Sequence, residues 1–123
     1  NFTWKFDNML KIPTLDSKSM WKELFLDIDN GYCDSLISAK FHNGLAESIL
    51  SIAKQIYPCC KEKKSEPKKI ALTGGVFQNK FLTKLVSKKL INEGYQVLKH
   101  SKIPANDGGI SFGQALVANA QKN

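Results

Sequence analysis

The start of the chain alternates apolar and polar residues. Residues 2–6 follow this period of two, Asp7 and Asn8 supply a turn, and the apolar run Met9–Ile12 resumes after it. Alternation on both sides of a turn predicts a β-hairpin with one buried face, which Pro13 would end.

Helical spacing replaces the alternation from Asp16, which is a plausible N-cap residue. We expect Asn30 and Gly31 to stop this helix. Its apolar positions, which are expected to share one buried face, are Met20, Trp21, Leu24, Phe25 and Ile28.

A longer helix is predicted from Asp34 to about Tyr57, because Pro58 blocks its continuation. Gly44 in its interior costs about 1 kcal/mol relative to alanine, which close packing against a neighbour would offset. The apolar stripe that is expected to be buried comprises Phe41, Leu45, Ile49, Ile52 and Ile56.

Residues 61–69 form a lysine-rich run with interleaved acids. A nucleic-acid patch could use such charges, but the interleaved acids favour a solvated loop. The following Ile70–Leu72 has the pattern of a short apolar strand, buried on both faces if its sheet is parallel.

The rest of the chain predicts a helix from Asn79 that ends before Gly94, a strand at Tyr95–Lys99 and a last helix over residues 109–120. Because the connections are short, this order predicts a parallel βαβ unit, with ligands at the carboxyl ends of its strands. In the helix from Asn79, the residues expected to face inward are Phe81, Leu82, Leu85 and Val86, and those expected on an outer stripe are Lys80, Lys84 and Lys88.

The predicted fold class is therefore α/β, in a single fragment that covers residues 1–123. Its expected segments are a hairpin and helix (1–33), a long helix (34–60), a loop (61–68) and a βαβα half with the ligand site (69–123).

Two glycine pairs stand where a strand gives way to a helix: Gly74–Gly75 and Gly108–Gly109. A glycine pair lets backbone N–H groups face a ligand without a Cβ in the way. The helix that follows adds unsatisfied N–H groups and a partial positive charge. The two turns are thus candidate anion cradles, and together they suggest a phosphate-bearing ligand held between them.

The formal net charge of +7 lies entirely in the half that holds these pairs. Residues 1–67 carry nine lysines and nine acids, whereas residues 68–123 carry nine lysines and only Glu93 and Asp107 as acids. An electropositive face attracts phosphate-rich partners. Every basic residue is lysine, so the arginine forks that read guanine are missing and a nucleic-acid partner is disfavoured.

Cysteine and histidine form no zinc pattern, and the odd number of cysteines favours a reducing, cytoplasmic compartment. No apolar run approaches the roughly 20 residues of a membrane helix, so no membrane partner is expected. The residues concerned are Cys33, Cys59, Cys60, His42 and His100.

Known phosphate motifs do not explain the two turns. Neither reads GxxxxGK[ST] or GxGxxG, and no residue has the context of a catalytic nucleophile, so none is assigned as catalytic. Asp107, between Asn106 and Gly108, could ligate a metal ion that binds ligand phosphates. It could instead cap the following helix, and local sequence alone favours the cap.

A family resemblance adds to this interpretation. The segments Leu72–Asn79 and His100–Ala115, with Ala39–Ala46 upstream, resemble the C-terminal end of the HypF family, the carbamoyltransferases of nickel–iron hydrogenase maturation. The similarity covers most of the chain from about Ser38, and residues 1–37 match in character only. It implies part of the second of two RNase H-like lobes in an actin/Hsp70/sugar-kinase type of fold.

The resemblance also implies an activity. ATP and carbamoyl phosphate would react through carbamoyl adenylate, and the carbamoyl group would pass to the C-terminal cysteine of a HypE-type protein acceptor. That group would become the cyanide ligand of the hydrogenase iron. The implied cofactors are ATP and a divalent metal ion.

Site residues carry over from the resemblance by position. Asp107 matches the family's metal-binding aspartate, but the HxxxH pair that completes the metal site is absent here. His42 is therefore expected to be a core-edge residue, and the isolated chain is expected to be inactive and to bind nucleotide weakly. The implied nucleotide-binding residues are Gly74, Gly75 and Asn79 in the first turn and Asn106, Gly108 and Gly109 in the second.

Two alternatives remain open. A lobe of a tRNA threonylcarbamoyladenosine transferase would share the fold, although those enzymes usually have small residues where this chain has Phe77 and Gln78. A basic binding module without chemistry would instead bind nucleic acid or a protein partner through charge alone.

Overall fold

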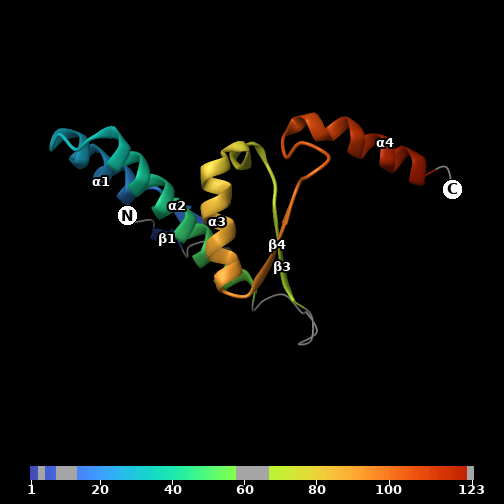
Figure 1. Ribbon diagram of the computed structural model, residues 1–123, viewed down its shortest axis with the longest axis horizontal. Coiled ribbons are helices and arrows are strands. Elements are labelled where there is room, and N and C mark those ends of the chain that lie inside the picture. The colour runs from blue at the N-terminus through green and yellow to red at the C-terminus, as the bar shows by residue number, and fades with distance from the viewer. Residues whose placement is uncertain (3–4, 8–13, 58–66, 122–123) are drawn as a thin grey trace. The chain divides into compact units, whose positions relative to one another are not determined.

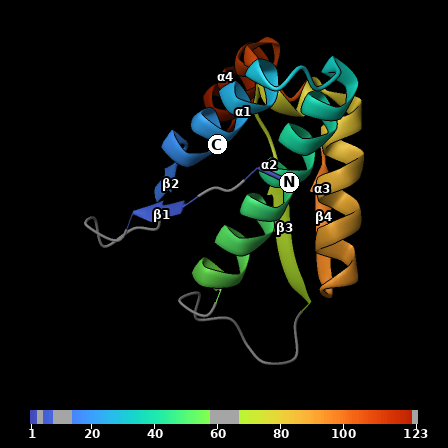
Figure 2. The ribbon, with the colours of Figure 1, turned by 90° about the vertical axis from the view of Figure 1, so that its left-hand side faces the viewer.

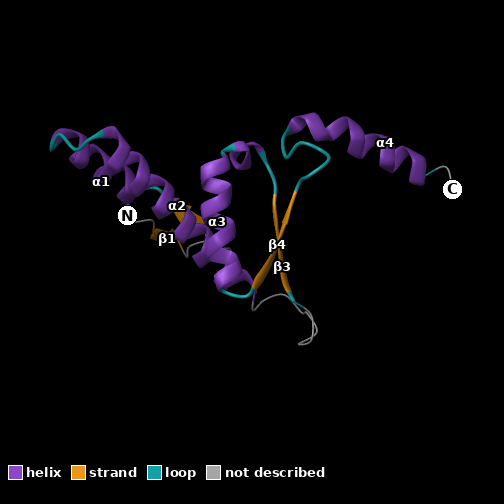
Figure 3. Ribbon diagram, in the orientation of Figure 1, coloured by secondary structure: helices purple, strands orange, loops and turns teal. Residues whose placement is uncertain are grey.

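The computed structural model describes residues 1–2, 5–7, 14–57 and 67–121, and they form an α/β structure in two compact units, Asn1–Glu66 and Pro67–Asn123 (Figures 1 and 3). The first unit contains β1 (Lys5–Asp7), β2 (Thr14–Asp16), α1 (Lys18–Asp29) and α2 (Asp34–Ile56). The second contains β3 (Lys68–Leu72), the 3₁₀ turn η2 (Gly75–Gln78), α3 (Lys80–Asn92), β4 (Tyr95–Lys99), the 3₁₀ turn η3 (Asp107–Gly109) and α4 (Ile110–Ala120).

The N-terminal hairpin is present, with a different second strand from the expected one. β1 pairs with β2 in antiparallel orientation, and Phe6 lies opposite Leu15. The run expected to pair, Met9–Ile12, lies outside the described residues. The hairpin does not end before Thr14 as expected, because Thr14–Asp16 is the strand that pairs with β1.

Helix α1 begins and ends close to the predicted residues. The Asp16 carboxylate accepts a hydrogen bond from the Lys18 amide at 2.9 Å, although the N-cap position itself is Ser17. Asn30 is the C-cap, and Gly31 follows with a φ of +71°, a conformation that favours glycine.

The predicted buried face of α1 is correct in part: Met20 is buried and Leu24 is half-buried. Asp27, two turns after Met20, is also buried. Trp21, Phe25 and Ile28 instead lie exposed on the neighbouring face, where the rings of Trp21 and Phe25 stack with centroids 6.1 Å apart. The apolar residues of α1 thus cover a wider arc than the core needs.

A polar cluster explains why α1 turns Asp27 inward. Asp27 forms an ion pair with Lys40 of α2. The same ammonium group lies 4.9 Å from the centre of the Phe2 ring and 5.6 Å from that of Tyr32, both within cation–π range. The cluster therefore connects the start of the chain, α1, the α1–α2 turn and α2.

Replacing Lys40 by methionine leaves the buried Asp27 carboxylate without its cation. Loss of one partner of a buried pair is strongly destabilising, but 28% of the Lys40 side chain is exposed, so we expect a loss of about 2 kcal/mol in the free energy of unfolding. The double variant Asp27→Leu/Lys40→Met should recover most of that loss in urea denaturation. A double variant as unstable as the sum of the two single changes would contradict this account.

Helix α2 has the predicted bounds, but its burial extends beyond the predicted stripe. Phe41, Leu45, Ile49 and Ile52 are half-buried and Ile56 is exposed, whereas the most buried positions are Gly44, Ala46, Ser48 and Leu50. Buried Gly44 agrees with the close packing that was expected to offset its cost. The buried Ser48 hydroxyl donates to the Gly44 carbonyl oxygen at 2.8 Å, so it is satisfied within the helix.

The sheet of the second unit consists of β3 and β4 in parallel, with Ile70 opposite Val97 and Leu72 opposite Lys99. Helix α3 packs alongside β4 (Figure 2). Ala71 and Leu98, on the other face, are exposed. The expected burial of β3 on both faces is therefore wrong, because the described elements cover only one face.

Helix α3 is anchored by Leu82, Val86 and Leu90, which recur every fourth residue and are almost fully buried. Phe81 was expected to face inward but is 57% exposed. The outer stripe of Lys80, Lys84 and Lys88 is exposed as predicted, and Gly94 follows the helix with a φ of +81°.

Helix α4 leads away from the two strands (Figure 1) and is exposed along its whole length. Its large apolar residues therefore have no cover among the described residues. No helix in the described part of the chain combines the length and the apolar character that a membrane crossing requires. The exposed apolar residues of α4 are Ile110, Phe112, Leu116 and Val117.

Candidate functional site

The two glycine turns meet at the carboxyl edge of the parallel sheet. The Gly74 amide donates to the Ala105 carbonyl oxygen at 2.7 Å. His100 Nε2 lies 3.0 Å from Thr73 Oγ1 and hydrogen-bonds to it. The predicted convergence of the turns is confirmed.

Sequence reasoning missed the link between His100 and Thr73, although a signal for it exists. Leu72 and Lys99 are opposite each other in the register, and each is the last residue of its strand. In a parallel pair, residues that directly follow aligned strand ends lie side by side. Thr73 and His100 are those residues.

The first turn has the free donors of an anion cradle. Gly74 has a φ of +99° and a ψ of 160°, a conformation open essentially to glycine alone. The chain then bends into η2, where Phe77 and Asn79 donate to carbonyl groups of the same turn. The amides of Gly75 and Val76 have no acceptor among the described residues. These two N–H groups are available to a ligand.

The second turn is different, because its glycine amides are already used. The Gly108 amide donates to Asn106 Oδ1 at 3.1 Å, and the Gly109 amide donates to the Asn106 carbonyl oxygen at 3.0 Å. A Cβ on Gly109 would lie 3.0 Å from the Pro104 carbonyl oxygen. The amides of Gly108 and Gly109 are therefore not free donors for an anion, and the Cβ contact at Gly109 shows that this glycine permits tight packing.

Two asparagines act as caps. Asn79 Oδ1 accepts from the Leu82 amide at 3.0 Å and caps α3, while Asn106 caps η3. Local sequence alone favoured Asp107 as the cap, and this is wrong because Asn106 occupies that position. The Asp107 side chain is exposed and has no hydrogen-bond or ion-pair partner among the described residues. Its carboxylate is thus free to bind a cation.

The described residues do not form a metal site by themselves. No three His, Cys, Asp or Glu residues within the described ranges lie close enough together to hold an ion. His42 is half-buried, and its Nδ1–H donates to the Ser38 carbonyl oxygen at 2.8 Å, as expected for a core-edge residue. A metal at Asp107 would therefore need ligands from outside the described residues.

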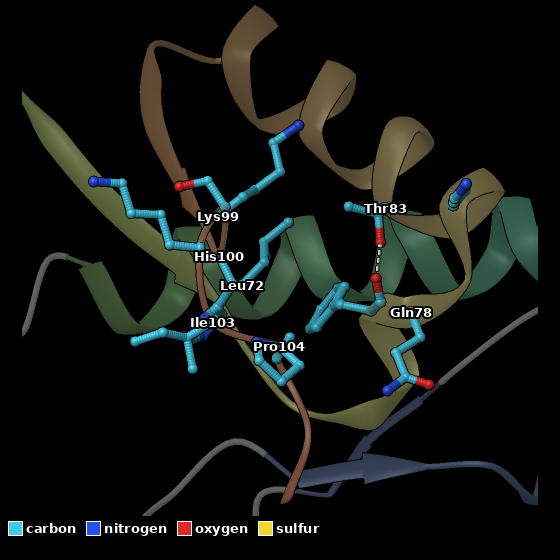
Figure 4. Close-up of a pocket in the computed structure, with 12 residues that line it drawn as sticks. Leu72, Gln78, Thr83, Lys99, His100, Ile103 and Pro104 are labelled. Carbon is cyan, nitrogen blue, oxygen red and sulfur yellow. Dashed lines mark hydrogen bonds between the residues drawn. The ribbon is translucent and has the colours of Figure 1, made fainter. Parts of the chain in front are cut away.

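Two cavities flank the joined turns and share the wall formed by His100 and residues 103–105. The cavity on the α4 side measures about 340 Å³ and is bordered by Asn106, Gly109 and apolar residues of α4. The cavity on the α3 side measures about 380 Å³ and is bordered by η2 and the first turn of α3 (Figure 4). The joined turns thus have concave surfaces on both sides.

Cys33 is a free, exposed cysteine in the first unit. The hydroxyl of Ser35, 3.3 Å from the sulfur, lowers the pKa of this thiol, and the Leu36 amide adds to that effect. Cys59 and Cys60 lie outside the described residues. Cys33 directly precedes α2, so it belongs to neither glycine turn.

Comparison with known proteins identifies the family. Residues 1–114 match the model of the second subdomain of the Kae1-like domain of HypF carbamoyltransferases. The chain belongs to the HypF carbamoyltransferase family. The match covers both glycine turns as well as the first unit.

Individual HypF proteins agree with this assignment. The chain is 34% identical over 110 residues to the probable carbamoyltransferase HypF of Methanocaldococcus jannaschii, covering 89% of this chain and 13% of that protein. It is 38% identical over 82 residues to carbamoyltransferase HypF of Synechocystis sp., covering 67% of this chain and 10% of that protein.

A crystal structure of full-length HypF in the phosphate- and nucleotide-bound form is similar with a TM-score of 0.82 and 33% sequence identity. The similarity covers 97% of this chain and 15% of that one. The chain therefore spans a small part of the HypF proteins that it matches, and its α/β structure is a partial lobe of that fold.

Proposed function

We propose that this chain provides one wall of the ATP site of a HypF-type carbamoyltransferase. The observation that carries the proposal is the first glycine turn, where the amides of Gly75 and Val76 lack acceptors at the carboxyl end of β3. Backbone donors at such a sheet edge fit the oxygens of a phosphate group. The lysine excess of residues 68–123 adds a favourable electrostatic field.

Asp107 has a distinct part in this proposal. Its carboxylate lies two residues beyond Ala105, which accepts the hydrogen bond from Gly74, and it is exposed. It would supply one oxygen ligand to a divalent metal whose other ligands come from elsewhere in the protein. When bound, such an ion neutralises phosphate charge. The Gly75 and Val76 amides would hold the phosphates in a fixed orientation, which lowers the entropic cost of reaction.

The remaining expectations apply to the whole protein. ATP and carbamoyl phosphate would form carbamoyl adenylate, and the carbamoyl group would pass to the C-terminal cysteine of a HypE-type acceptor. Support comes from membership of the HypF family and from relatives that are named carbamoyltransferases. Because the chain has no complete ligand set for the metal among its described residues, we expect it to be inactive in isolation.

The variant Asp107→Asn tests this proposal in the full-length natural polypeptide. Metal-dependent ATP affinity, measured by calorimetry with and without Mg²⁺ or Mn²⁺, should fall by at least about tenfold. Thermal unfolding should stay unchanged, because the carboxylate has no partner among the described residues.

Asn106→Ala is the matched neighbouring variant. It removes the cap of η3 and should lower stability by about 1 kcal/mol. An Asp107→Asn protein that keeps the full metal dependence of ATP binding would refute the assigned role of this carboxylate.

A further inference from the structure

The cavity on the α3 side of the glycine turns has a strongly cationic border. Lys80 comes from the first turn of α3, Lys99 from the end of β4, and Lys102 from the loop after it. No aspartate or glutamate is among the residues that line this cavity. Three lysines from three segments therefore contribute to the lining of one concave surface.

These charges are not neutralised by the protein. None of the three ammonium groups has an ion pair or a hydrogen bond among the described residues. The acids of the described part of the second unit are Glu93 and Asp107, and neither lines the cavity. A concave surface with like charges and no counter-charge concentrates the field and attracts anions.

The inner wall of the cavity is mainly apolar. Leu72, Ile103 and Pro104 lie around its centre in Figure 4. The Thr83 hydroxyl faces η2 and donates to the Phe77 carbonyl oxygen at 2.7 Å, so its proton is already used. Gln78, His100 and Ser101 supply the other polar side chains of the lining, beside the lysine border.

We propose that this cavity binds a phosphorylated ligand, with the phosphate attracted to the border that carries Lys80, Lys99 and Lys102. Three cations without a counter-charge suit a dianion with several oxygen acceptors better than a single carboxylate. The phosphate could belong to the tail of a nucleotide or to a separate compound such as inorganic pyrophosphate. The lining of this cavity includes neither Gly75 nor Val76 nor Asp107, the three residues that contact ATP or its metal in the function proposed above.

Lysine footprinting tests the site directly in the full-length natural polypeptide. Brief acetylation in the presence and absence of pyrophosphate, read residue by residue by mass spectrometry, reports which amines the ligand covers. We expect protection of Lys80, Lys99 and Lys102. Lys84 and Lys88 are exposed on the same helix and do not line the cavity, so they should react equally in both samples.

Affinity provides the second measurement. The variant Lys99→Met/Lys102→Met should bind pyrophosphate at least about tenfold more weakly, because each lost charge removes a charge-assisted contact. The control Lys84→Met/Lys88→Met carries the same change of net charge and should match the natural protein. Both pairs are exposed, and circular dichroism checks that each variant folds. If the double variant does not fold, Lys102→Met alone takes its place, with Lys88→Met as control.

Repeating the footprinting with ATP shows which compound supplies the phosphate that binds in the cavity. Protection of the same three lysines by ATP, with competition against pyrophosphate, would assign the cavity to the nucleotide tail, and protection by pyrophosphate alone would assign it to a separate ligand. Protection that persists in Asp107→Asn separates this site from the proposed metal site. Equal protection of all five lysines, or equal loss of affinity in the cavity and control variants, would overturn the proposal.

Discussion

Replacing Leu90 by alanine should lower the free energy of unfolding of the second unit by about 3 kcal/mol. Leu90 has no exposed surface and is the last of three buried residues that recur every fourth position in α3. Truncation removes its apolar contacts and leaves a cavity that the neighbouring side chains fill only in part. Urea denaturation of the full-length polypeptide, followed by hydrogen exchange of the β3 and β4 amides, measures the loss.

Ile91→Ala is the matched control, because Ile91 is the next residue in the same helix and is 57% exposed. It should change stability by less than about 0.5 kcal/mol. Equal losses for the two variants would show that α3 does not bury the face described here.

The two glycines of the first turn should respond differently to alanine. Gly74→Ala places a side chain on a residue with a φ of +99°, which should cost about 2 kcal/mol and weaken the hydrogen bond to Ala105. Gly75→Ala introduces a Cβ that meets no atom within 4 Å, at a residue without a positive φ. Its thermal unfolding should match that of the natural protein.

ATP affinity is a second property in which the effect of Gly75→Ala can be measured. If Gly75 lies against a phosphate as proposed, the methyl group of Gly75→Ala should reduce ATP affinity while stability is retained. Calorimetry and thermal denaturation on the same samples test both expectations. Gly74→Ala with natural stability would contradict the strain argument, and Gly75→Ala with natural ATP affinity would contradict the close approach.

Helix ends could be predicted from sequence because they depend on residues close in the chain. Asn79 caps α3 through its own side chain, and Gly31 and Gly94 take the left-handed conformations that end helices. The parallel pairing of β3 and β4 followed from the short connections around α3. These features need no knowledge of the rest of the molecule.

Helix faces were harder to predict, because several adjacent positions are apolar. In α1 the inward position went to Asp27 rather than Ile28, since Asp27 pairs with Lys40 thirteen residues later. In α3 Phe81 is exposed although it precedes the buried Leu82. Periodicity defines an apolar arc, and the choice within that arc depends on contacts with other elements.

The sequence alone determined the α/β class, the helix ends and the two glycine turns, because each depends on local backbone preferences and short-range periodicity. Only the tertiary structure decided that Gly74 is bonded to Ala105, that Asn106 rather than Asp107 caps η3, and that the free amides belong to the first turn. A glycine pair permits a donor to face a ligand, but the path of the distant loop decides whether the protein uses that donor itself.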